Sequence, residues 1–457
     1  MAALAPIAAA FLASSPYLGT GPTAITSLLT LGALTAVAVP GTNEFIATAA
    51  ILALLVGAIR VVLGLIRAGV VAYLMSQPVL RGFTSAAAIV IIASQIPTVF
   101  GSATDASNPI VGAIDVVAHP GSWEPAALGV AVAVAILMLG GRRIHRLFPG
   151  VLVAVILGIV YSRIAAYGGP KVGSITGGLP PFGLSLPWSS IWSLLIPAAV
   201  IGVVGFSEPA SIARNYATLE RKRWDPNREL ISQGVANIAA GIGGGFPAGG
   251  SFTRSALVRD SGARTRLAGG ITGLTVLLLL PFMGALAPLP TAVLGAGIIV
   301  AVVDLINFKE LFSYRHCARL QFAIALATFT LSLVLAPHVE RALVVGIVLA
   351  VGAHLWRELR LSIPAWTEEE VLHLDPHGVL YFASAPGLQD AFTKLLADHP
   401  DAERLVVHLG GLGRVDLTGA LVLRDLLTDA EEAGLKTEVV DVPPQAEKII
   451  SRVLGPP

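Results

Sequence analysis

Two apolar stretches of the sequence are interrupted by residues that are able to bind an anion. The first runs from Tyr17 to Ala24, and the second runs from Gly243 to Ser255. Pro22 suits the first turn of a helix, and Ser251 or Thr253 suits a cap, so each segment predicts a helix that starts inside the membrane. A helix start exposes N–H groups and about half a positive elementary charge, so two such ends facing one cavity favour an anion.

The pairing of the two segments is more informative than either alone. Irregular backbone at membrane depth is tolerated only where protein or a water-filled cavity covers it. Antiparallel broken helices in corresponding places indicate an inverted-repeat secondary transporter with substrate near the midplane. The predicted substrate-binding residues are Gly21, Pro22, Thr23, Ser251, Phe252, Thr253 and Arg254. Alternatively, glycine and proline only allow close packing of helices here.

Two charged residues lie close to these segments in apolar sequence. Glu208 follows a charge-free run of more than thirty residues, and a carboxylate at the centre of a spanning helix costs roughly 2.5–3.5 kcal/mol. Glu208 is therefore our candidate for proton coupling; the alternative is that it lies at a helix end, with Arg214 as a loose partner. Arg254 offers a fixed positive charge for an anion; the alternative is an interfacial residue that only sets topology.

Other kinds of chemistry have no support in the sequence. There is no His-x-x-x-His motif or cysteine pair, and the single Cys317 excludes an internal disulfide framework. The glycine-rich run 241–250 contains neither nucleotide-binding motif. A net charge of +1 gives no reason to expect a nucleic-acid partner. We therefore predict no metal, no cofactor and no enzyme activity.

The elements that must position these residues are membrane-spanning helices. The chain is 54% hydrophobic and only 13% charged, whereas soluble proteins have about 25% charged residues. Charge-free runs recur along it, and about 20 apolar residues span a bilayer as a helix. Basic residues fall on alternate loops, among them Arg60 and Arg67, then Arg142 and Arg143, then residues 221–223. These loops are predicted to be cytoplasmic, in a multi-pass protein of the cell (inner) membrane.

After Trp356 the sequence becomes charged and mixed in composition. Residues 378–384 and 404–409 read as strands, and residues 386–397 and 418–433 read as helices. We therefore predict a small α/β domain, which the parity of the loops places in the cytoplasm.

Several of these segments together resemble the sulfate permease family. The resemblance rests on residues 20–24, 205–213, 227–237 and 244–256. The C-terminal domain is similar to a STAS domain through Val415-Asp416-Leu417-Thr418-Gly419-Ala420. In soluble relatives the hydroxyl residue of that turn can be phosphorylated, so the resemblance makes Thr418 and Asp416 regulatory candidates. Thr418 also suits an ordinary helix cap.

The resemblance implies a seven-plus-seven inverted-repeat transporter, usually a homodimer. The anion is expected between the starts of the family's third and tenth helices, here Gly21 to Thr23 and Ser251 to Arg254. Some proton-coupled relatives carry a carboxylate that matches Glu208. Met1 matches a position within the second helix of the family. We therefore expect a transmembrane domain at 1–358 that lacks the first helix and part of the second, and a linker with a cytoplasmic STAS domain at 359–457.

The function predicted from the sequence is secondary active transport of a small anion of the sulfate, bicarbonate or dicarboxylate class. Protons or Na⁺ are possible coupling ions, and alternating access is the expected mechanism. Two alternatives stay open. One is an uncoupled, channel-like anion conductor, and the other is a transport-dead membrane anchor whose STAS domain docks a cytoplasmic protein partner.

Overall fold

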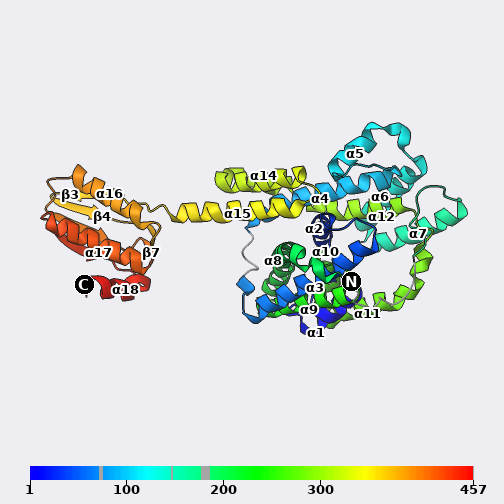
Figure 1. Cartoon of the computed structure of the whole chain (residues 1–457), viewed down its shortest axis with the longest axis horizontal. Helices are drawn as coiled ribbons and strands as arrows, with labels where there is room; N and C mark the ends of the chain where they lie inside the picture. Colours follow the sequence, from blue (N-terminus) through cyan, green and yellow to red (C-terminus); the bar gives the residue numbers. More distant parts are fainter. Residues whose placement is uncertain (71–75, 146–147, 176–185, 456–457) are drawn as a thin grey trace. The chain divides into compact units, whose positions relative to one another are not determined.

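The structure is a computed structural model that describes residues 1–70, 76–145, 148–175 and 186–455. The chain forms two compact units, Met1–Val348 and Leu349–Pro457, and each is described by itself (Figure 1). The contacts thus divide the chain inside helix α15 (Val339–Glu358), while the sequence placed the division at the end of that helix.

Seven helical segments in the described residues are long and apolar enough to cross a membrane. They are Asn43–Leu65, Gln77–Phe100, Pro125–Ile144, Trp188–Leu219, Leu267–Leu286, Thr291–Cys317 and Val339–Glu358. A segment of this length and composition matches the thickness of the hydrocarbon layer. The prediction of a multi-pass membrane protein is confirmed.

The helices of the first unit form two bundles (Figure 1). The first bundle contains α1 (Leu4–Leu12), α2 (Ala24–Thr35), α3 (Asn43–Leu65), α8 (Ile191–Leu219), α9 (Pro226–Ile242), α10 (Phe252–Asp260) and α11 (Leu267–Leu279). Its tightest contacts join α3 to α9 and α8, and α1 to α9 and α11.

The second bundle contains α4 (Gln77–Phe100), α5 (Pro109–Ala118), α6 (Pro125–Ile144), α7 (Gly150–Ile164), α12 (Thr291–Val302), α13 (Phe308–Cys317), α14 (Arg319–Val334) and the first part of α15. Helix α4 is its centre, in contact with α5, α6, α12, α13 and α14. Short 3-10 turns at Pro120–Ser122, Trp188–Ser190, Leu280–Leu286 and Val303–Leu305 complete the unit. Helix α2 lies at the boundary, because it packs on α3 and α8 of the first bundle and on α4 of the second.

Glycines set the close approach of α3 and α9. A Cβ on Gly57 would lie 2.7 Å from the carbonyl oxygen of Gly234, and one on Gly241 would lie 2.8 Å from that of Ala50. The glycines repeat at seven-residue spacing on both helices, at 57 and 64 and at 234 and 241. Small residues at such spacing let two backbones pack directly in a membrane. Close packing therefore explains these glycines.

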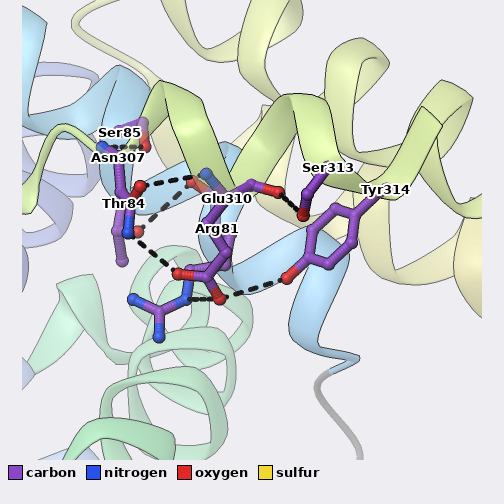
Figure 2. Close-up of polar contacts among 7 residues, drawn as sticks. All are labelled: Arg81, Thr84, Ser85, Asn307, Glu310, Ser313 and Tyr314. Carbon is purple, nitrogen blue, oxygen red and sulfur yellow. Dashed lines mark hydrogen bonds and ion pairs between the residues drawn. The ribbon is translucent and has the colours of Figure 1, made fainter. Parts of the chain in front are cut away.

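A polar cluster ties α4 to α13 within the second bundle, as Figure 2 shows. The guanidinium of Arg81 pairs with Glu310 at 2.9 Å. The side chain of Asn307 caps α13 by accepting from the backbone N–H of Glu310 at 3.0 Å, and its backbone N–H donates to Ser85 at 3.3 Å. The hydroxyl of Tyr314 donates to the same carboxylate of Glu310. These contacts join the N-terminal halves of the two helices.

The second unit is an α/β domain. Its main sheet has the strand order β3 (Ala365–Glu368), β4 (Val371–Leu374), β6 (Arg404–His408), β8 (Lys436–Val440). Strands β3 and β4 are antiparallel and the other pairs are parallel. A second, parallel pair joins β5 (Gly378–Leu380) to β7 (Leu412–Val415). The helices are α16 (Ala385–Asp398), α17 (Leu417–Glu432) and α18 (Pro444–Leu454).

Leucine and valine side chains from the strands pack against the helices in one buried core. The predicted strand at 378–384 is shorter than expected, because it ends at Leu380. A turn follows, in which the hydroxyl of Ser384 donates to the carbonyl of Val379 and accepts from the N–H of Tyr381. These side-chain bonds compete with continuation of the strand.

Candidate functional site

The two interrupted segments meet in the first bundle. Strand β1 (Thr20–Gly21) pairs with strand β2 (Gly249–Gly250) in antiparallel register, with Thr20 opposite Gly250. The N–H of Ser251 donates to the carbonyl of Gly19 at 3.1 Å and extends the pairing by one bond. Residues more than 220 positions apart in the chain therefore share one short ribbon.

Each strand leads directly into a capped helix. The hydroxyl of Thr23 accepts from the N–H of Thr26 at 3.2 Å and caps α2, and the hydroxyl of Ser251 accepts from the N–H of Arg254 and caps α10. Pro22 was expected in the first turn of α2, but it precedes the cap, because the backbone stays extended through Thr23. Since the strands are antiparallel, α2 and α10 start at one place and run in opposite directions.

The predicted site residues differ in their accessibility. Gly21 and Thr23 are buried, and Pro22, Ser251 and Arg254 are half-buried. Phe252 is 47% exposed, and Thr253 is exposed as well. The accessible part of the site is therefore the first turn of α10.

Arg254 reaches from α10 to the start of α2. Its Nη1 donates to the carbonyl of Pro22 at 2.6 Å. Its Nε and Nη2 are buried, and the described residues offer them no hydrogen-bond acceptor. Unpaired guanidinium donors beside two helix starts are a suitable environment for an anion.

Glu208 lies against the same helix start. Its carboxylate lies near the backbone N–H of Phe252 and faces the charge of Arg254. The residue is inside α8, about three turns before that helix ends at Leu219. The alternative that Glu208 marks the end of a helix is therefore wrong. This position could not be predicted from the sequence. Proline usually ends a helix, but α8 continues through both of its prolines.

A buried arginine that the sequence assigned to a loop holds the ribbon in place. Arg60 lies inside α3 and is fully buried. Its guanidinium donates to the carbonyls of Gly202 at 3.0 Å, Ala248 at 3.1 Å and Ile201 at 3.2 Å. It therefore joins α3, α8 and the residue that precedes β2. The signal in the sequence was that Arg60 is a lone charge with uncharged residues on both sides, from position 45 to position 66.

Helix α9 supplies two further supports that sequence reasoning missed. The amide of Gln233 donates to the hydroxyl of Thr20 at 2.8 Å. The side chain of Asn237 binds Ala248 twice, because it accepts from its N–H at 2.8 Å and donates to its carbonyl at 3.1 Å. These bonds satisfy polar groups of a non-helical segment that would otherwise be unpaired.

Glu229 fixes the chain where it enters β1. The side chain is fully buried and accepts from the backbone N–H groups of Ser14 at 3.0 Å and Ser15 at 2.9 Å. The hydroxyl of Ser232, one turn further along α9, donates to the carbonyl of Ala9. The end of α1 is thereby tied to α9.

The two regulatory candidates lie in the second unit, at the start of α17. Asp416 is the cap, because its carboxylate accepts from the N–H of Gly419 at 2.7 Å and from that of Phe382 at 3.3 Å. Thr418 was a candidate cap as well, but it lies inside the first turn, where its side chain is exposed. The described residues contain no cluster of three or more His, Cys, Asp or Glu side chains suited to a metal.

Comparison with known proteins shows the family of the chain. Residues 2–328 match the sulfate permease family and residues 362–453 match the STAS domain. A probable sulfate transporter 4.2 from Arabidopsis thaliana is 27% identical over 93% of this chain and 68% of its own length. A probable sulfate transporter from Mycobacterium tuberculosis is 34% identical over 72% of this chain and 60% of its own length.

The fold resembles that of the murine solute carrier 26 family member A9 anion transporter in the inward-facing state. The two chains are 20% identical and superpose with a TM-score of 0.88, over 99% of this chain and 82% of the other. The sequence matches and the shared fold agree, and this chain belongs to the sulfate permease family, with a C-terminal STAS domain.

Proposed function

We propose that this chain transports small anions across a membrane. The observation that carries the proposal is the β1–β2 pairing, which brings the starts of α2 and α10 together beside the unpaired donors of Arg254. Substrates of the sulfate, bicarbonate or dicarboxylate class have the charge that this environment favours. The names of the sulfate transporters that the chain resembles support the same class, although the chain spans only 68% and 60% of their lengths.

Transport proceeds in this proposal by alternating access. The first bundle carries the anion at the ribbon and moves against the second bundle, with α2 at the moving boundary. Residues 1–358 form the transmembrane domain, because α15 continues to Glu358. The positions of the basic loops support a cytoplasmic STAS domain, and the family resemblance supports a homodimer in the inner membrane. The exposed Thr418, with Asp416 beside it, is a site where phosphorylation would regulate binding of a protein partner.

Glu208 is our candidate for the coupling proton. It touches the first turn of α10 and faces Arg254, so its ionisation changes the charge seen by an anion at that place. A proton carried by Glu208 would compensate part of the charge of the transported anion. Na⁺ is the other candidate coupling ion, and it would leave the uptake independent of a proton gradient.

The test is uptake of radiolabelled sulfate, bicarbonate or oxalate into proteoliposomes that contain the full chain. Arg254→Ala is expected to lower uptake more than about tenfold, because one charge-assisted pair contributes roughly 1.5–3 kcal/mol. The matched control is Arg259→Ala on the same helix, where the arginine pairs with Glu220 at 3.5 Å instead. Equal uptake by Arg254→Ala and the wild type would overturn the proposal.

Coupling is tested in the same vesicles. Glu208→Gln is expected to remove the pH dependence of uptake, while Glu220→Gln, just beyond the end of α8, preserves it. Flux that follows voltage alone, with no effect of a proton or Na⁺ gradient, would identify an uncoupled conductor. Absence of anion binding by the purified chain, together with capture of a protein by the STAS domain, would identify a membrane anchor.

A further inference from the structure

A second buried carboxylate lies where the two bundles touch. Glu340 is the second residue of α15, and its side chain is packed against α2. The imidazole Nδ1 of His338 donates to the carbonyl of Gly32 in α2 at 3.0 Å, and it lies 3.4 Å from Glu340 Oε1. A Cβ on Gly32 would overlap Glu340 Oε2 and lie 2.8 Å from the carbonyl oxygen of Pro337. The contact therefore depends on the absence of a side chain at Gly32.

The contact between Gly32 and Glu340 joins the two bundles, which move relative to each other in the proposed mechanism. Gly32 is about two and a half turns along α2 from its cap at Thr23, so it moves with the anion site. Glu340 belongs to the second bundle. The loop before it is held there by Asn108, the cap of α5, whose side chain donates to the carbonyl of Ala336 at 2.8 Å. Relative movement of the bundles must break the contact with Gly32.

The environment of Glu340 changes with that movement. In the present structure Oε2 is buried, and the described residues offer it no hydrogen-bond donor. The charged or titratable groups that face it are His338 and Arg341, both from its own segment, with Arg341 Nε at 3.9 Å. From α2 the contact receives Gly32 and its backbone carbonyl, which also accepts from the hydroxyl of Thr35 at 3.1 Å.

An ionised carboxylate is destabilised where one of its oxygens is buried without a partner. Docking of α2 therefore favours the protonated form of the His338–Glu340 pair. When α2 moves away, water reaches the carboxylate and favours its ionised form. One proton is thus bound in the docked state and released in the undocked state.

We propose that Glu340, together with His338, is a proton-binding site that closes the pathway on the side toward which α2 runs. This inference rests on the bundle movement in the proposed function. The site is separate from Glu208, because it touches α2 at Gly32, about two and a half turns from the cap at Thr23. Its occupancy controls docking of α2, whereas Glu208 acts on the anion.

The experiment measures access to α2 directly. Cys317, which is exposed, is first replaced by alanine. A single cysteine is then placed by Ala33→Cys next to Gly32, where the native side chain is 4% exposed. Labelling of the full chain in liposomes by a thiol reagent is followed between pH 5.5 and 8.5. Rates are divided by those of Val39→Cys, whose position is 69% exposed, which removes the pH dependence of the thiol itself.

The normalised rate is expected to rise with pH by up to about tenfold per pH unit, the limit for one linked proton. Glu340→Gln should hold α2 docked, with slow labelling at every pH. Gly32→Ala should label rapidly at every pH, because its Cβ displaces Glu340. Glu44→Gln, at an exposed carboxylate in the first turn of α3, is the control and should behave as its parent. His338→Gln is the second variant and should weaken docking without adding volume.

A rate in Glu340→Gln that still rises with pH as in the parent would overturn the proposal, and so would a pH-independent parent. Neither result would affect the anion uptake that depends on Arg254. Conversely, pH-dependent labelling that requires Glu340, in a chain that takes up no anion, would sustain this site and refute the transport function.

Discussion

Replacement of Gly234 by alanine tests whether the α3–α9 contact sets the position of the site. A Cβ there would lie 2.8 Å from the carbonyl oxygen of Gly57 and 2.8 Å from the backbone nitrogen of Val61. Both neighbours are backbone atoms of α3, so no change of rotamer relieves the overlap and the helices must separate. Overpacking of this kind costs about 1–3 kcal/mol, and contact with two backbone atoms favours the upper end.

Alanine also favours the helix over glycine, by about 1 kcal/mol. The overlap is the larger effect, so Gly234→Ala should destabilise the protein by about 2 kcal/mol. The matched control is Gly129→Ala in α6, where a Cβ would meet nothing within 4 Å. That change should stabilise the protein by up to about 1 kcal/mol. The two variants are therefore expected to change the free energy of unfolding in opposite directions.

The measurement is the midpoint of thermal unfolding of the detergent-solubilised chain, with and without anion. Because α9 carries Gln233 and Asn237, which bond to Thr20 and Ala248, separation of α3 and α9 should also weaken the anion-induced rise of the midpoint. A midpoint that rises in Gly234→Ala as it does in Gly129→Ala would refute the reasoning, since it would show that α9 has room for the methyl group.

Three further predictions concern individual side-chain contacts. Arg60→Lys keeps the charge but cannot reach three carbonyls at once, so the affinity for the anion should fall in a binding titration. Gly205→Ala should also lower the affinity, because its Cβ would lie 2.8 Å from Nη2 of Arg60. Unchanged affinity in both variants would exclude Arg60 as a support of the ribbon. Asp416→Ala removes the cap of α17 and should lower the free energy of unfolding by about 1–2 kcal/mol. Thr418→Ala should change it by less than about 0.5 kcal/mol. Thermal unfolding measures both, and a larger loss in Thr418→Ala than in Asp416→Ala would identify Thr418 as the cap. Arg81→Ala should lower the free energy of unfolding by less than about 1 kcal/mol, because the side chains of Arg81 and Glu310 are 41% and 33% exposed. A larger loss in the same assay would show that this polar cluster fixes the position of α4.

Most of the architecture could be predicted from the sequence because the bilayer leaves few choices. Long charge-free runs predict helices in a bilayer, and most of the long apolar segments that the structure describes overlap such a run. The two breaks at Gly21 and Gly250 were visible because glycine, proline and hydroxyls are unusual together in such runs. The start of α17 was visible for a similar reason, since Asp416 precedes an amphipathic stretch.

The supports of the site could not be predicted, because they depend on contacts between distant segments. Arg60 was read as a marker of topology, since a basic residue near the end of an apolar run usually faces the aqueous phase. Only the three carbonyls that surround it, from α8 and from the segment before β2, show why it is buried. Glu229 and Gln233 lie in a polar part of the sequence, where nothing distinguishes a buried residue from an exposed one.

Glycine has two structural roles in the first bundle, and the sequence does not distinguish them. At Gly249 and Gly250 it belongs to an extended ribbon that starts a helix, while at Gly57 and Gly234 it allows two helices to touch. Both uses look alike along the chain. The structure contains both, and they depend on each other. The glycine contact brings α9 close to α3, and α9 then supplies the side chains that satisfy the ribbon.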